Sequence, residues 1–395
     1  MIVREFLHWV RTAPASERAE ATSALARAYL YSDLSPDDLA AAEGAMLMLL
    51  DDPSPLVRRA LADALAASPA APAAIVIALA ADQPQIAAPV YALSPLFVDA
   101  DLVDAAATGG GAIQAAIASR AALPCSVAAA IAEVGSAESC LLLVENMSAE
   151  IAPLSFDRIV ERFGHLAAIR EALLARDDIT AATRHALVTK LSQALAGFVA
   201  GRAWLDLDHA QRITREACEK ATVTIAAESS DTELGALVRH LCASGQLTAG
   251  LILRALLSGN IALFEAALAE LTDLPVARVS GLVHDRGSVG LRALFDKARL
   301  PPSTFAAFKA AVEAMREGFG YEAGGATRLK RRMIERVLTR CEGATPSEVA
   351  PLLTLLRRFA TEAAREEARL FCDELVADEL IADELLADDR RPAAA

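Results

Sequence analysis

A short apolar helical pattern that recurs about every 30 residues constrains this chain most. In segment 54–65, Ser54 and Pro55 are typical of a helix start, because serine can cap free N–H groups and proline there loses no hydrogen bond. One helix cannot bury an apolar face alone, so the recurrence predicts helices stacked into a solenoid. The paired apolar positions are Leu56/Ala60, Ile86/Val90, Ile113/Ile117, Cys140/Val144 and Ile169/Leu173, at spacings of 30, 27, 27 and 29 residues.

The first copy of this pattern carries a resemblance. Residues 51–65 resemble the second helix of a HEAT repeat, in which Asp, Val-Arg and small residues recur. Later copies depart from it, since Ala87 and Ala88 stand where Val57 and Arg58 stood. In 54–65 we expect a buried face on one side and Arg58, Arg59 and Asp63 on the other. The residues expected on the buried face are Leu56, Ala60, Leu61, Ala64 and Leu65.

From about Ala175 the pattern changes to short helices with tight capped turns. Residues 247–257 and 261–271 are predicted helices, separated by Ser258-Gly259 and capped by Asn260. Segments 253–256, 264–268 and 285–287, with Gly259-Asn260, resemble an uncharacterised bacterial helical-repeat family, a domain of unknown function, over roughly residues 30–320. That resemblance supports the fold and implies no chemistry.

These observations predict an all-α protein: a HEAT-like helical-repeat solenoid followed by a second helical block. The predicted parts are a solenoid at 1–175, a second all-α domain at 176–345, a C-terminal helix at 346–372 and an acidic low-complexity tail at 373–395. The tail repeats a five-residue unit three times. Five residues turn a helix by about 140° net, so its leucines form no single stripe. We expect an inert extension or, alternatively, a segment that folds back on basic residues 328–340.

The distribution of charge restricts the partners. The formal net charge is −14, and residues 60–157 hold ten acidic residues against one basic residue, Arg120. Such a segment cannot form a nucleic-acid groove, because phosphate contacts need basic side chains. Its sparse charge can leave an apolar surface, which marks contact with another protein, or can reflect harmless exposed methyl groups.

A basic stripe stands apart from this acidic background. Arg328, Arg332, Arg336 and Arg340 recur every four residues and therefore share one side of a predicted helix. Such a helix can bind an acidic peptide, an anionic membrane or nucleic acid. Aromatic residues for base stacking are missing. We prefer the ordinary interpretation, a solvated face on a core helix, and keep the four arginines as candidate partner-binding residues.

The search for catalytic motifs gives little. No Cys-x-x-Cys pair, paired-histidine motif or phosphate-binding glycine loop is present, so the sequence predicts no metal and no cofactor. His284, Asp285 and Arg286 could form an oriented base, but they stand where a helix ends, and positive groups there stabilise terminal carbonyls. We therefore prefer a structural role, and keep Asp285 and Arg286 as candidate partner-binding residues.

The preferred function is a non-enzymatic scaffold or adaptor that binds partner proteins on its helical-repeat surface. The alternatives are a nucleic-acid-binding repeat protein that uses residues 328–340, and an enzyme with a site near His284. Six scattered cysteines, an acid in the first turn and no apolar leader predict a cytoplasmic protein. No membrane span is expected, since the uncharged stretch 64–81 is mostly alanine with two prolines. Homo-oligomerisation is left open.

Overall fold

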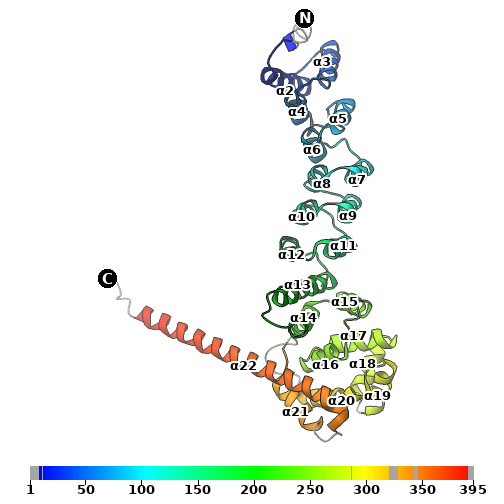
Figure 1. Cartoon of the computed structure of the whole chain (residues 1–395), viewed down its shortest axis with the longest axis vertical. Coiled ribbons are helices and arrows are strands. Elements are labelled where there is room, and N and C mark those ends of the chain that lie inside the picture. The colour runs from blue at the N-terminus through cyan, green and yellow to red at the C-terminus, as the bar shows by residue number, and fades with distance from the viewer. Residues whose placement is uncertain (1–8, 11, 286, 320–327, 342–345, 390–395) are drawn as a thin grey trace. The chain divides into compact units, whose positions relative to one another are not determined.

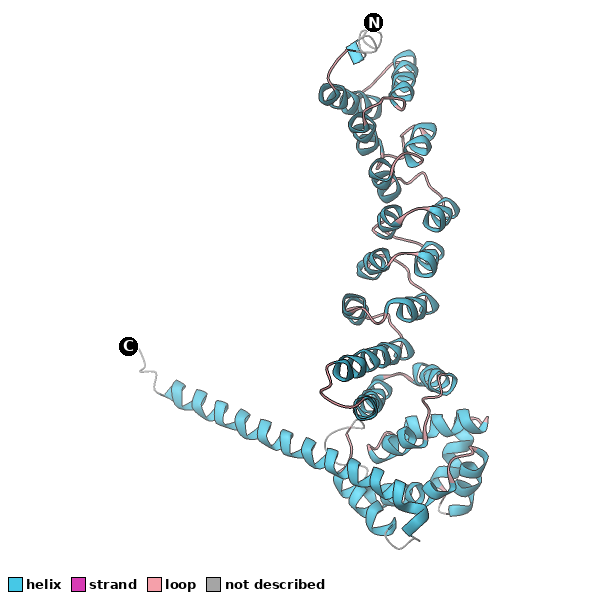
Figure 2. Ribbon diagram, viewed as in Figure 1, coloured by secondary structure: helices cyan, strands magenta, loops and turns pink. Residues whose placement is uncertain are grey.

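The structure is a computed structural model that describes residues 9–10, 12–285, 287–319, 328–341 and 346–389. Within these residues every regular element is a helix, and none is a strand (Figure 2). The predicted all-α class is therefore confirmed. The chain divides into two units, Met1–Ile179 (unit 1) and Thr180–Ala395 (unit 2).

Unit 1 is a succession of mostly short helices. Helices α4, α6, α8, α10 and α12 pack one on the next, and α7, α9 and α11 form a second row beside them (Figure 1). That these pairs are HEAT-like repeats stays a prediction. The helices are α2 (Ala15–Tyr31), α3 (Pro36–Leu49), α4 (Pro55–Leu65), α5 (Ala73–Ala80), α6 (Pro84–Leu93), α7 (Asp99–Thr108), α8 (Gly111–Ala118), α9 (Cys125–Val134), α10 (Ala137–Glu145), α11 (Pro153–Phe163) and α12 (Ala167–Leu174).

The repeated apolar pairs form the core of the first row. The eight residues in the four later pairs are all buried: Ile86, Val90, Ile113, Ile117, Cys140, Val144, Ile169 and Leu173. The first copy differs, because Leu56 is 53% exposed and Val57 is buried instead. Val57, Leu61 and Leu65 follow one another at four-residue spacing, so they share the face of α4 that packs on α2 and α6. Of the five residues expected on the buried face, Leu61 and Leu65 are buried, Ala60 and Ala64 are partly buried, and Leu56 is exposed.

Helices of eight to eleven residues leave a large share of their backbone carbonyls without an intrahelical partner, since the last four of each helix are free. In unit 1 a side chain from the next layer takes up several of them. Arg120, which follows α8, donates to the carbonyls of Tyr91 and Ser94 at the end of α6, at 2.5 and 2.8 Å. Asn146, which follows α10, donates to the carbonyls of Ala118 and Arg120 at the end of α8, at 2.9 and 2.7 Å.

The same contact recurs further along. Arg176, which follows α12, donates to the carbonyls of Val144 and Asn146 at the end of α10, at 3.1 and 3.0 Å. In the second row, Arg162 of α11 donates to two carbonyls at the end of α9, those of Ala132 and Gly135, at 2.6 and 2.7 Å. We call these four side chains, Arg120, Asn146, Arg162 and Arg176, the carbonyl clamps.

Replacing Arg120 with methionine tests the clamps. Arg120→Met keeps a long side chain but leaves two terminal carbonyls of α6 without their donor, so we expect the free energy of unfolding to fall by about 1–3 kcal/mol. Urea unfolding followed by circular dichroism measures it. Arg27→Met is the control, because exposed Arg27 donates within its own helix, to the carbonyl of Ser23, at 3.3 Å. Equal stability of both variants would contradict the role of the clamps.

Two ion pairs fasten the first helices of unit 1. Arg18 of α2 forms two hydrogen bonds with Asp52, and Arg58 of α4 forms two with Asp82. The Arg58 guanidinium holds the pKa of the Asp82 carboxyl below its usual range. Because the folded state prefers the charged carboxylate, Asp82 stabilises unit 1 above its unfolded pKa, and this contribution is lost as pH falls through the folded pKa.

A pH series on Asp82→Asn measures that contribution. We expect the variant to be less stable than the wild type by about 1 kcal/mol at pH 7. The difference should shrink as pH falls below about 4, where the wild-type carboxyl takes up its proton. Thermal unfolding at pH 7, 5, 4 and 3 follows it. Asp63→Asn is the matched control, since Asp63 pairs with Arg59 on the same helix and is half exposed. A difference for Asp82→Asn that stays constant with pH would show that the charge is irrelevant.

Unit 2 combines long helices with short ones and has an aromatic core. Phe264, Phe295 and Phe308 are buried, and the Phe308 ring centroid lies 6.0 Å from that of Phe264 and 5.4 Å from that of Phe295. The elements are α13 (Ala181–Gly201), α14 (Leu207–Glu228), α15 (Asp231–Ala243), α16 (Ala249–Leu257), α17 (Ile261–Thr272), α18 (Val276–His284), α19 (Ser288–Lys297), η1 (Pro302–Thr304), α20 (Phe305–Ala314), η2 (Met315–Phe319), α21 (Arg331–Cys341) and α22 (Pro346–Asp389).

The last helix is longer than the sequence suggested. Helix α22 continues to Asp389, so residues 373–389, predicted as a separate tail, are the end of the same helix. Leucine, alanine and glutamate have high helix propensity, and this stretch has no glycine or proline to stop a helix. The side chains of 377–389 lie outside the described residues, and so does the predicted contact between the tail and 328–340.

Candidate functional site

The basic stripe lies mainly on helix α21. Met333, Ile334 and Val337 form its buried face, as the amphipathic pattern predicts. Arg332 and Arg336 are exposed on the opposite side. Arg328 precedes the helix, which begins at Arg331, so the stripe is three arginines on a helix and one on the segment before it.

Acidic residues of the same chain contact the basic stripe. Arg336 lies 3.4 Å from a carboxylate oxygen of Glu317, and Arg340 contacts Glu313 and lies 2.7 Å from the other oxygen of Glu317. Arg328 lies 3.8 Å from Glu366. Arg332 also has a contact partner, so its side chain is not free. A partner that uses this stripe would therefore compete with Glu313 and Glu317 for the arginines.

The second predicted cluster is an exposed helix end. His284 ends α18, and its Nε2 lies 2.9 Å from Oε1 of Glu265. Asp285 is exposed, and its carbonyl accepts a hydrogen bond from Arg316, as does that of Val283. A positive group does contact the terminal carbonyls of α18, but that group is Arg316. Arg286 lies outside the described residues.

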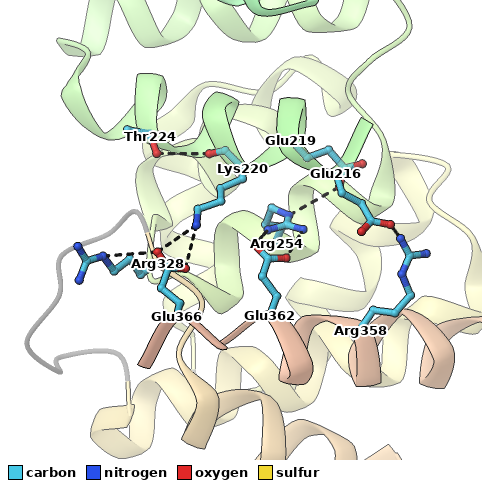
Figure 3. Close-up of polar contacts among 9 residues, drawn as sticks. All are labelled: Glu216, Glu219, Lys220, Thr224, Arg254, Arg328, Arg358, Glu362 and Glu366. Atoms are coloured by element: carbon cyan, nitrogen blue, oxygen red, sulfur yellow. Dashed lines mark hydrogen bonds and ion pairs between the residues drawn. The ribbon is translucent and has the colours of Figure 1, made fainter. Parts of the chain in front are cut away.

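A buried arginine in unit 2 escaped the sequence analysis. Arg254 of α16 is 1% exposed, and its two terminal nitrogens lie 2.8 and 2.9 Å from the carboxylate oxygens of Glu362 on α22 (Figure 3). Its Nε lies 3.7 Å from Glu219 on α14, and its guanidinium carbon lies 4.6 Å from the Phe359 ring centroid. Burial raises the pKa of Glu219, and the charge of Arg254 opposes that rise. The one available signal was a lone arginine in the apolar run of α16.

Further ion pairs extend this cluster along α22. Lys220 of α14 lies 3.0 Å from both carboxylate oxygens of Glu366, which also faces Arg328, and Arg358 contacts Glu216 (Figure 3). We call Arg254, Glu219, Glu362, Lys220 and Glu366 the α22 anchor. Each of its charged side chains faces one of opposite sign, so we assign it a structural role, which is to hold α22 against α14 and α16.

An apolar groove lies in unit 1. It has a volume of about 410 Å³ between α5 and α7, and we call it the α5–α7 groove. Ile77 of α5 is 62% exposed beside it, and the rings of Tyr91 and Phe97 stack there with centroids 5.0 Å apart. The groove is lined by Ala73, Val76, Ile77, Ala80, Ala81, Tyr91, Leu96, Phe97, Asp101, Asp104, Ala105 and Thr108.

The charge of the groove has one sign. Exposed Asp101 and Asp104 line one side, and no basic residue is among its lining residues. Arg120, the single basic residue of 60–157, is engaged with the carbonyls of Tyr91 and Ser94. Burial and the nearby charge of Asp101 raise the pKa of Tyr91. The α5–α7 groove thus offers an apolar floor with an acidic edge.

Two kinds of feature are absent from the described part of the chain, metal-ligand clusters and membrane-spanning helices. No group of three or more His, Cys, Asp or Glu residues among the described ones is placed to hold a metal ion. Of the helices that the structure describes, none has the length and apolar composition needed to cross a membrane.

The α22 anchor can be tested at Glu362. Glu362→Gln removes the charge that faces a guanidinium with 2% side-chain exposure, so we expect a loss of about 3 kcal/mol in the free energy of unfolding. Glu367→Gln is the control, because its pair with Arg331 is half exposed, and no measurable change is expected. Chemical unfolding measures both. If Glu362→Gln is as stable as the control, Arg254 does not depend on Glu362.

One protein family matches residues 86–347, from α6 to the start of α22, and is described as an uncharacterised protein conserved in bacteria. The matched range includes the part of the α5–α7 groove from Tyr91 onward and most of unit 2. No curated protein and no solved structure matches the chain. Because the match spans more than half of the 395 residues, the chain belongs to this uncharacterised bacterial family, DUF2336.

Proposed function

We propose that this protein is a non-enzymatic scaffold or adaptor, and that a partner protein docks in the α5–α7 groove of unit 1. The observation that carries the proposal is the exposure of Ile77 next to the stacked Tyr91 and Phe97 rings. Large apolar side chains that gather at an open surface are typical of protein-binding sites. Stacked helix pairs of the HEAT type, which we also propose for unit 1, offer extended surfaces for such binding.

The acidic edge of the groove selects the partner. Asp101 and Asp104 favour a segment that carries lysine or arginine beside an apolar side chain, since opposite charges at an interface rim steer association. Aromatic side chains are enriched at the centres of interfaces, where they contribute most of the binding energy. A helical or extended segment with one apolar anchor and adjacent basic residues fits both features.

The alternatives have weaker support. Binding of nucleic acid through residues 328–340 would compete with the contacts that Arg336 and Arg340 make to Glu313 and Glu317. An enzyme site at His284 would stand on an exposed helix end, where Asp285 is exposed and Arg316 donates to the carbonyls of Val283 and Asp285. For the compartment we propose the cytoplasm, because all six cysteines are free thiols, and free thiols fit a reducing environment.

A charge placed in the groove tests the proposal. Ile77→Lys puts a cation on the apolar floor, where it repels a basic partner and cannot be buried without cost. We expect partner recovery to fall at least tenfold when the variant is purified by affinity from its native host and co-purifying proteins are quantified by mass spectrometry.

Leu154→Lys serves as the control. Leu154 is 81% exposed on α11 of the same unit and does not line the groove, so this variant should recover the partner at the wild-type level. Raising the salt concentration should weaken the wild-type interaction, because the acidic edge is exposed. If Ile77→Lys retains the same partners as Leu154→Lys, the groove is not the docking site.

A further inference from the structure

A groove in unit 2 lies between α14 and α22, beside the α22 anchor. Its volume is about 620 Å³, which is in the range of small-molecule sites, and we call it the α14–α22 groove. Among its lining residues, which all belong to the described part of the chain, Ala217 is the one apolar residue and none is aromatic. Interface centres between proteins are rich in aromatic side chains, so this lining suits a polar ligand better than the apolar anchor of a partner protein.

Basic residues outnumber acidic ones in the α14–α22 groove, by five to three. Each of the three acids already contacts a base of the same chain (Figure 3): Glu362 contacts Arg254, Glu366 contacts Lys220, and Glu216 contacts Arg358. The acids of the groove therefore neutralise the bases of the α22 anchor and Arg358, and leave the remaining bases of the groove without a partner.

Those remaining bases are three arginines of α22. Arg357, Arg365 and Arg369 are exposed and line the groove, and none of their guanidinium groups forms an ion pair or a hydrogen bond with another described residue. Spacings of eight and four residues place them along one side of the helix, over about 18 Å. The exposed acids Glu367 and Asp373 of the same helix do not line the groove. The groove thus carries an excess of positive charge.

The chemistry of the guanidinium group points to phosphate. A guanidinium offers two parallel N–H donors to an anion and keeps its charge at physiological pH. A phosphate monoester carries about two negative charges and three acceptor oxygens, whereas a carboxylate carries one charge and two oxygens. Because Arg365 and Arg369 stand about one helical turn apart, they can share one phosphate group, and Arg357 can contact a second.

We propose that the α14–α22 groove binds a molecule that carries two or more phosphate groups, with Arg365 and Arg369 as its main contacts and Arg357 as a further one. The phosphates belong to a free small molecule or to a lipid headgroup, two sources that share this chemistry. Glu362 and Glu366 hold α22 in place beside the ligand. The site is independent of protein docking in the α5–α7 groove of unit 1.

Inorganic triphosphate tests the free source. We expect saturable binding to the full-length protein in isothermal titration calorimetry, and weaker binding as the salt concentration rises, because the arginines are exposed. A hexaglutamate peptide, which carries only carboxylates, should bind about tenfold more weakly. Vesicles of phosphatidylcholine with phosphatidylinositol bisphosphate test the lipid source by co-sedimentation, with phosphatidylcholine vesicles that contain phosphatidylserine as the comparison. Binding of triphosphate alone identifies a free ligand, and binding of the bisphosphate vesicles alone identifies a headgroup.

The test variant combines Arg365→Gln with Arg369→Gln. It removes two charged donors, so binding of the phosphate probe should weaken about tenfold or more. Its melting temperature should stay within a few degrees of the wild type, since neither guanidinium has a partner to lose. Arg278→Gln is the control, because Arg278 is exposed on α18 and does not line the groove, and it should bind like the wild type. No binding of either phosphate probe, equal binding of hexaglutamate, or undiminished binding by the double variant would each overturn the proposal.

Discussion

The need to satisfy backbone carbonyls at helix ends governs unit 1. A helix of eight residues, such as α8, has four carbonyls at its end that its own turns cannot pair, and unit 1 is built of many such ends. The carbonyl clamps donate hydrogen bonds to these carbonyls from the neighbouring layer. Arg120 does so for α6, Asn146 for α8 and Arg176 for α10. Each contact joins residues about 30 positions apart, so the polar network has the same period as the apolar core. Burial of methyl groups holds the layers together, and the clamps fix their spacing.

A different constraint applies to unit 2, because a charged side chain is buried in it. Arg254 is enclosed by Glu362, Glu219 and the Phe359 ring, and a guanidinium in such a place is tolerated only with partners of opposite charge. A buried ion pair adds little net stability compared with a well-packed apolar pair, but it does not tolerate a shifted register. The anchor therefore specifies where α22 lies on α14 and α16 more than it strengthens the contact.

The sequence allowed the all-α class and the repeated core to be predicted, because both follow from local periodicity. Ile86/Val90 and its later counterparts were found by spacing alone, and all are buried. The partners of charged residues could not be predicted, since Arg340 meets Glu313 and Arg254 meets Glu362, 108 residues away. The α5–α7 groove was equally hidden. Helix α5 is apolar on every side, so no periodicity distinguishes exposed Ile77 from buried Ile75 and Val76.

The spacing of the carbonyl clamps has an evolutionary consequence. Donor and acceptor always belong to adjacent layers, so removing or duplicating one whole layer rejoins a clamp to an equivalent helix end. Insertion of a few residues inside a layer would instead separate a guanidinium from its carbonyls. The clamps of the first row would therefore keep their partners after a gain or loss of one whole layer, whereas a short insertion within a layer would leave terminal carbonyls without a donor.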